Sequence, residues 1–104
     1  MNFTDKEKSR LQKIGISTLY LFGSRAEKTA HEKSDYDFAV LLKDASLVKP
    51  GRETHEIYQQ IFEILYPLCG ESVIDIVFLQ SGVSLELQAN VVKNGKILFD
   101  ENPG

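Results

Sequence analysis

Runs of apolar residues that alternate with polar segments predict four β-strands along the chain. Residues 17–22 and 35–42 are rich in aliphatic and aromatic side chains and are bounded by glycine or polar residues. Residues 73–79 form the most apolar run and predict a third strand, and residues 96–99 predict a short final one. Together these runs predict a sheet.

The segments before and between these runs have the sequence patterns of helices. Residues 4–7 fit a capping box and predict a helix that continues to about Lys13. Ser84 is placed to cap another helix over residues 85–93. Helices that alternate with strands in this way predict a mixed sheet of three to four strands flanked by helices, α/β in the broad sense (α+β), in a single domain over residues 1–104.

The longest helical pattern covers about residues 53–66. We expect this helix to stop before Pro67, because the proline ring excludes a continued helical hydrogen bond. Beside an aliphatic core stripe lies an aromatic row at positions i, i+4 and i+8, which consists of Tyr58, Phe62 and Tyr66. Core packing is the simpler interpretation of this row, and a surface that faces a partner protein is the alternative.

Two aspartates begin the second apolar run. In an extended strand, the side chains of Asp35 and Asp37 project from one face, about 6.6 Å apart along the axis. Like charges at that spacing repel by roughly 2–3 kcal/mol at an effective dielectric of about 20. A divalent cation converts this repulsion into a binding site, and Mg²⁺ typically takes one or two carboxylates together with substrate phosphates. The simpler alternative is a solvated strand end.

A Gly-Ser turn precedes these aspartates, with ten residues between Ser24 and Asp35. Gly23 lets the backbone approach a ligand closely, and the N–H groups of a turn that opens into a helix favour phosphate. Ser24 adds a hydroxyl donor, and Arg25 adds a permanent positive charge. Phosphate contacts beside a metal-binding pair indicate metal-assisted chemistry on a nucleoside triphosphate, whereas a plain turn is the alternative.

One further carboxylate, Asp75, is the only charge in the third apolar run. Burial of an unpaired carboxylate costs several kcal/mol or forces its protonation, so Asp75 requires a partner if it is buried. A hydrogen-bonded structural aspartate satisfies this requirement. Completion of the cluster of Asp35 and Asp37 is the functional alternative.

Composition restricts the compartment and the partners. A hydrophobic content of 42% and a charged content of 26% are ordinary for a soluble globular chain, and the net charge of −3 argues against a standing nucleic-acid surface. The single cysteine, Cys69, cannot form an internal disulfide, and we expect it to be a buried apolar filler. Without a signal-peptide pattern or an apolar run near 18 residues, a cytoplasmic location is expected.

The order Gly23, Ser24, ten residues, Asp35-x-Asp37 resembles the signature of the DNA polymerase β-type nucleotidyltransferase superfamily. The wording Phe-Gly-Ser-Arg-Ala…Ser-Asp-Tyr-Asp-Phe-Ala-Val is similar to its smallest branch, the minimal nucleotidyltransferase (MNT) proteins, which are typically the antitoxins of prokaryotic HEPN/MNT pairs. The similarity extends from the strand at Leu19 to the strand at Ile97. Many relatives continue the motif with Arg and Gly, whereas Glu27-Lys28 stand here.

This resemblance implies a palm-like core that catalyses in-line attack on the α-phosphate of ATP, with pyrophosphate as the leaving group. Asp35, Asp37 and Asp75 would be the catalytic and metal-binding residues, holding two Mg²⁺ ions, for which Mn²⁺ is a possible substitute. Asp75 would complete the carboxylate set from the later strand. Residues 23–25 would bind the nucleotide by its β- and γ-phosphates.

The resemblance also implies the acceptor and the partner. A HEPN-domain ribonuclease toxin would be both, and adenylylation of one of its tyrosines would neutralise it. Larger relatives have a second domain that binds the acceptor, so we expect another protein or another copy of the chain to supply that function in an oligomer. A catalytically silent antitoxin that neutralises by binding, and the catalytic subunit of an aminoglycoside-type small-molecule nucleotidyltransferase, are the two alternatives.

Overall fold

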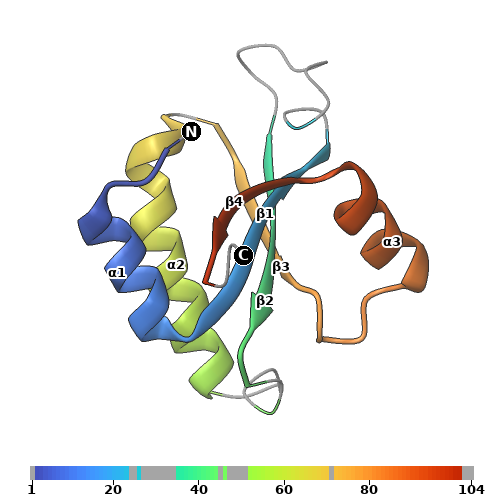
Figure 1. Cartoon of the computed structure of the whole chain (residues 1–104), viewed down its shortest axis with the longest axis horizontal. Helices are drawn as coiled ribbons and strands as arrows, with labels where there is room; N and C mark the ends of the chain where they lie inside the picture. Colours follow the sequence, from blue (N-terminus) through green and yellow to red (C-terminus); the bar gives the residue numbers. More distant parts are fainter. Residues whose placement is uncertain are drawn as a thin grey trace.

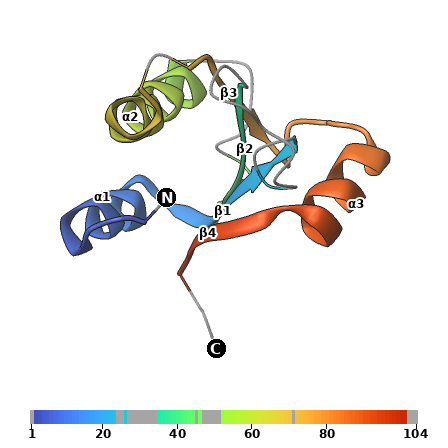
Figure 2. The ribbon, with the colours of Figure 1, turned by 90° about the horizontal axis from the view of Figure 1, so that it is seen from above.

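The computed structural model describes residues 2–23, 26, 35–44, 46, 52–70 and 72–101. In these residues a four-stranded sheet lies between two helices on one face and one helix on the other (Figures 1 and 2). In chain order the elements are α1 (Asp5–Ile14), β1 (Ile16–Phe22), β2 (Tyr36–Leu42), α2 (Arg52–Cys69), β3 (Ile74–Phe78), α3 (Leu85–Asn94) and β4 (Lys96–Asp100).

The sheet is mixed, with the strand order β3-β2-β1-β4. β1 is antiparallel to both of its neighbours, β2 and β4, whereas β2 and β3 are parallel. A parallel pair requires a long crossover, and α2 supplies it between β2 and β3. This α+β architecture confirms the sequence prediction of a mixed sheet of three to four strands flanked by helices.

The two faces of the sheet follow from the alternation of side chains along each strand. Leu19 and Leu21 of β1 point into the main core, which α1 and α2 cover. The alternate residues of β1, Tyr20 and Phe22, point to the opposite side of the sheet. There they pack against a small cluster that includes Val91 of α3. Figure 2 shows the sheet from above, with α1 and α2 on one side and α3 on the other.

The first helix has the ends that the sequence predicts. The Glu7 backbone N–H donates to Thr4 Oγ1 at 3.2 Å, and the Thr4 backbone N–H donates to Glu7 Oε1 at 2.8 Å, which forms a complete capping box. Such a cap contributes about 1 kcal/mol. Gly15 ends α1 with φ at +99°, a left-handed conformation that favours glycine.

The second helix differs from its prediction at the C-terminal end, because α2 passes Pro67 and continues to Cys69. A proline in the last turn removes few helical hydrogen bonds, and the continued helix buries Cys69, which is 5% exposed, in the main core. Burial of this cysteine was predicted and is confirmed. Gly70, with φ at +62°, follows the helix.

The aromatic row on α2 lies at the edge of the core. Tyr58 and Phe62 are half-buried against the main core, and their rings stack at a centroid distance of 6.5 Å. Tyr66 stacks on Phe62 at 5.6 Å but is mostly exposed. Core packing therefore accounts for two of the three rings.

No described helix is both long enough and apolar enough to span a membrane.

Candidate active site

Two of the three sequence-predicted carboxylates are direct neighbours across parallel strands. Asp37 of β2 and Asp75 of β3 are register partners, although the sequence separates them widely. Adjacent strands lie about 4.8 Å apart, and partners in register project from the same face, so the two side chains lie together. Asp35 comes immediately before β2 and is exposed. The structure thus brings Asp75 to the position expected for a third member of the carboxylate cluster.

The covered face of the sheet fixes the backbone that bears these carboxylates. The Tyr36 backbone N–H donates to the Val73 carbonyl oxygen at 2.9 Å, which joins the starts of β2 and β3. The Tyr36 ring stacks on Phe38 at 5.9 Å with an interplanar angle of 6°, and both rings contact the main core. Packing on the α1/α2 face therefore sets where Asp37 emerges on the opposite face.

Burial and mutual repulsion act on Asp37 most strongly. Its partial burial, followed by the negative charges of Asp75 and then Asp35, raises the pKa of the Asp37 carboxyl above its usual value of 3.8. Asp75 is exposed, so the requirement that a buried carboxylate has a partner does not apply to it. β3 is a terminal strand of the sheet, and Asp75 lies near its open beginning, so solvent reaches it.

The glycine of the predicted phosphate turn lies directly against this cluster. Gly23 has φ at +73°, and a Cβ built on it would stand 2.5 Å from Asp37 Oδ2. Phe22, the residue before it, is the register partner of Asp37 across β1 and β2. Only a residue without a side chain allows this approach of the turn to the carboxylate. Ser24 and Arg25, with Glu27-Lys28, lie outside the described residues.

The chemistry of the donors fits a hard divalent cation. In the described part of the chain, no group of three or more His, Cys, Asp or Glu side chains lies close enough together to bind a metal ion. Burial and then the negative charges of Asp75 and Asp35 nevertheless raise the pKa of the Asp37 carboxyl, so a cation beside Asp37 would relieve the repulsion from both neighbours. Carboxylate oxygens are the protein ligands that Mg²⁺ prefers, so these residues suit such an ion.

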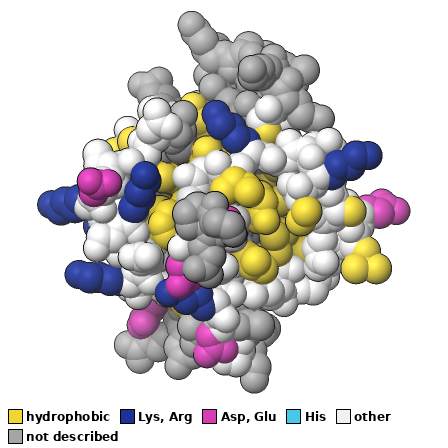
Figure 3. Space-filling model, in the orientation of Figure 1, with side chains coloured by type: hydrophobic (Ala, Val, Ile, Leu, Met, Phe, Trp, Pro, Cys, Tyr) yellow, Lys and Arg dark blue, Asp and Glu magenta, His cyan; other side chains and the backbone are white. Residues whose placement is uncertain are grey.

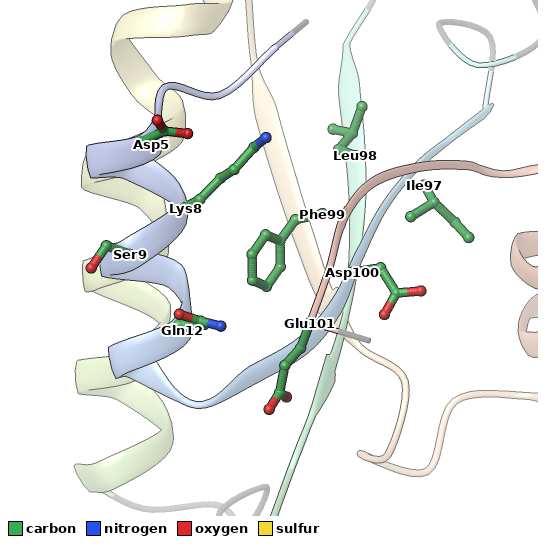
Figure 4. Close-up of a pocket in the computed structure, with 9 residues that line it drawn as sticks. All are labelled: Asp5, Lys8, Ser9, Gln12, Ile97, Leu98, Phe99, Asp100 and Glu101. Carbon is green, nitrogen blue, oxygen red and sulfur yellow. The ribbon is translucent and has the colours of Figure 1, made fainter. Parts of the chain in front are cut away.

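A cavity of about 530 Å³ lies elsewhere, between α1 and β4 (Figure 4). Its walls are formed by Asp5, Lys8, Ser9 and Gln12 of α1 and by residues 97–101. In Figure 4 the aliphatic chain of Lys8 reaches from the helix toward the strand, and the Phe99 ring points to the helix side. Among the described candidate site residues, none lines this cavity, so it is distinct from the carboxylate cluster.

A mixed sheet with two helices on one face, and with acidic residues on adjacent strands on the face that carries α3, matches the architecture of a nucleotidyltransferase. The family model described as "Polymerase beta, Nucleotidyltransferase" matches residues 6–104. The chain belongs to this family, which confirms the resemblance found in the sequence.

Solved structures of toxin–antitoxin complexes resemble the chain. One is a toxin–antitoxin crystal structure with AMP-PNP, at 29% identity and a TM-score of 0.63, covering 95% of this chain and 76% of the matched one. Another is a mutant of the toxin–antitoxin MntA-HpeT, at 28% identity and a TM-score of 0.63, covering 94% and 73%. A second MntA-HpeT mutant gives 28% and 0.62, covering 98% and 76%. No curated relative matches the sequence at a significant level.

Proposed function

We propose that this nucleotidyltransferase transfers AMP from ATP to a protein acceptor and serves as the antitoxin of a toxin–antitoxin pair. The register of Asp37 with Asp75, with Gly23 packed against Asp37, is the observation on which the proposal depends. The similarity to toxin–antitoxin structures, one of them with AMP-PNP, supports the cellular role and the choice of nucleotide. The acceptor is a tyrosine of a HEPN-domain ribonuclease toxin, as the MNT resemblance implies.

Each residue has a defined role in this proposal. Asp35 and Asp37 would hold the cation that accompanies the triphosphate, and together with Asp75 they would hold a second one. When bound, Mg²⁺ neutralises phosphate charge and lowers the pKa of the attacking hydroxyl. Asp75, the most accessible carboxylate of the register pair, accepts the proton of that hydroxyl. Gly23, with Ser24 and Arg25, binds the β- and γ-phosphates.

The bonds that change follow from in-line displacement. The acceptor oxygen forms a bond to the α-phosphorus of ATP while the bond from that phosphorus to the bridging oxygen of pyrophosphate breaks. Pyrophosphate leaves with the electron pair of that bond, and the acceptor proton passes to Asp75. The product is an AMP ester of the acceptor. Positioning and charge stabilisation supply most of the rate in such reactions.

Labelled ATP tests this function directly. The purified chain and the protein encoded beside it are mixed with labelled ATP and Mg²⁺, and label on the neighbour is followed by gel. We expect transfer that the double substitution Asp35→Asn with Asp37→Asn slows by on the order of 10³-fold, equivalent to about 4 kcal/mol. If label never reaches the neighbour while its toxicity is still suppressed, the chain is not the proposed enzyme.

Neutralisation by binding alone is the second candidate, and the substitution of Glu27-Lys28 for the usual Arg-Gly favours it. A purely occluding antitoxin does not need its carboxylates. The same double variant, expressed with the toxin, separates the two functions: growth that survives the substitution supports occlusion, and growth that stops supports catalysis. Transfer measured on the same pair distinguishes loss of chemistry from loss of the complex.

A further inference from the structure

A groove with aromatic walls lies on the surface of α2. It has a volume of about 390 Å³. The described residues that line it, which we call the α2 groove, are His55, Tyr58, Gln59, Phe62 and Glu63. Tyr58 and Phe62 are half-buried, because they contact the main core and also line the groove. The other three side chains are exposed.

Charge is unevenly distributed along the chain around this groove. From Glu53 to Val92 the sequence has no Lys or Arg, so all 12 Lys and Arg residues lie before or after this segment. The acidic residues within the segment are Glu53, Glu56, Glu63, Glu71, Asp75 and Glu86. The segment contains nearly all of α2, all of β3 and most of α3, and it has a formal charge of −6 in a chain whose total is −3.

The cations gather on another side of the molecule. In Figure 3, Lys and Arg side chains stand over α1, at the left. Figure 2 shows that α1 lies on the β4 side of the sheet, whereas α2 lies beside β3 at the other edge. Among the described residues no ion pair involves Glu63, and its side chain is exposed. A cation from a partner protein can therefore reach this carboxylate.

We infer that the α2 groove receives an arginine side chain from a basic surface of a partner protein, and this inference rests on the proposed function for the identity of the partner. A planar guanidinium group stacks on aromatic rings, such as those of Tyr58 and Phe62, and pairs with a carboxylate, such as that of Glu63. Attraction between the acidic segment and the basic surface orients the partner. The same negative charge repels nucleic acid.

The α2 groove leads toward the end of the sheet that bears the carboxylates. α2 connects the end of β2 to the beginning of β3, so its last turn lies at the end of the sheet where these parallel strands begin. Asp37 and Asp75 lie at that same end. Tyr66, which is 58% exposed, stacks on Phe62 at 5.6 Å and extends the row of rings in that direction. A partner bound in the groove therefore lies beside β3, the strand on which Asp75 is exposed.

Three substitutions test the groove. Glu63→Lys reverses its charge without a loss of packing, because the side chain is exposed and lysine is an equally good helix former. Glu86→Lys is the matched control, with the same change in net charge at an exposed position of the same acidic segment, but in the first turn of α3 on the opposite face of the sheet. Phe62→Leu keeps an apolar side chain against the core and removes the ring.

Titration calorimetry with the protein encoded beside this chain measures each effect. We expect Glu63→Lys to bind roughly tenfold more weakly than wild type or worse, Phe62→Leu about threefold more weakly, and Glu86→Lys with an unchanged dissociation constant. The rise in melting temperature caused by Mg²⁺ and ATP should be equal in wild type and all three variants, because none of the substitutions touches the nucleotide site. An unchanged dissociation constant in Glu63→Lys, an equal loss in Glu86→Lys, or no complex with wild type overturns the inference.

Other outcomes identify a different occupant. If Glu63→Lys weakens the complex but Phe62→Leu binds as tightly as wild type, the contact is ionic only, and a stacked arginine is wrong. If sedimentation shows a wild-type dimer that Glu63→Lys converts to monomer, the groove binds a second copy of this chain, and the inference is wrong.

The groove and the proposed enzyme can fail separately. Binding that Glu63→Lys weakens, without any transfer of label from ATP, contradicts the proposed enzyme but leaves the groove in place. Transfer of label with an unchanged KM for the neighbour in Glu63→Lys contradicts the groove but leaves the enzyme in place.

Discussion

The two faces of the sheet differ in their side chains and in their roles. On the α1/α2 face, long aliphatic and aromatic side chains from both helices and all four strands form one continuous core. On the α3 face, the fully buried set is small, consisting of Ala39, Leu79 and Val91, and the same face bears Asp37 and Asp75. The first face therefore stabilises the fold, whereas the second leaves charged and apolar groups open for ligands.

This contrast explains why repulsion among carboxylates is tolerated. A domain of this size has a net stability of only about 5–15 kcal/mol, so packing elsewhere must offset the repulsion within the acidic cluster. Tyr36 contributes to this packing, because its ring packs into the main core while its neighbours Asp35 and Asp37 face the opposite side. Stability from one face thus maintains an unfavourable arrangement on the other.

The largest expected effect is the loss of a core ring. Phe38 is fully buried on the α1/α2 face, so Phe38→Ala should lower the free energy of unfolding by about 3–5 kcal/mol. Val77, half-buried on the α3 face, should lose only about 1 kcal/mol on Val77→Ala. Urea titrations of both variants measure the difference. A loss for Val77→Ala as large as that for Phe38→Ala, although fewer atoms are removed, would mean that the α3 face contributes more to stability than its small buried set indicates.

The second effect concerns ligand binding on the open face. With ATP and Mg²⁺ at about 100 times the dissociation constant, the folded state should gain about 2.7 kcal/mol, seen as a rise in melting temperature. Asp35→Asn with Asp37→Asn should abolish this rise, whereas Glu63→Gln, on the exposed side of α2, should keep it. A double variant that still responds fully to the nucleotide would show that the carboxylates do not bind it.

The α1/α2 face of the sheet was predictable from the sequence, whereas the α3 face was predictable only in part. Strands, helices and the capping box follow from local periodicity, and the main core follows from the same pattern. Two features depend on tertiary context instead. Which carboxylate is buried depends on strand order, which placed Asp75 on a terminal strand, and the end of α2 depends on the burial of Cys69 beyond Pro67. No local pattern encodes either one.

The third effect comes from the glycine at the boundary between turn and cluster. Gly23→Ala should cost about 1–3 kcal/mol from its left-handed backbone and should also push the Asp37 carboxylate aside. Gly15→Ala is the matched control, because it has the same backbone sign with nothing within 4 Å of the added Cβ. Both variants should melt lower, but only Gly23→Ala should weaken Mn²⁺ binding in a calorimetric titration. Equal Mn²⁺ affinity in both would separate the turn from the metal site.

The smallest effect is a pH dependence that has opposite signs at two aspartates. The pKa of Asp37 is raised above 3.8 by burial, Asp75 and Asp35, so the native state binds its proton more tightly than the unfolded state does. Its contribution is therefore a penalty that is absent below 3.8 and grows as pH rises through the raised value. Asp37→Asn, without metal, should melt a few degrees above wild type at pH 7 and lose that advantage in acid.

Asp44 provides the opposite case. The hydroxyl and then the backbone N–H of Ser46, at 2.6 Å and 3.0 Å, lower the pKa of the Asp44 carboxyl. Its contribution is therefore stabilising above pH 3.8 and is lost as pH falls through the lowered value. Asp44→Asn should thus melt slightly below wild type at pH 7, and the melting temperatures of the two proteins should converge in acid.

The Asp37 prediction has a clear contradicting outcome. If Asp37→Asn instead melts below wild type at neutral pH, the Asp37 carboxylate stabilises the fold, and repulsion within the cluster is not its dominant interaction.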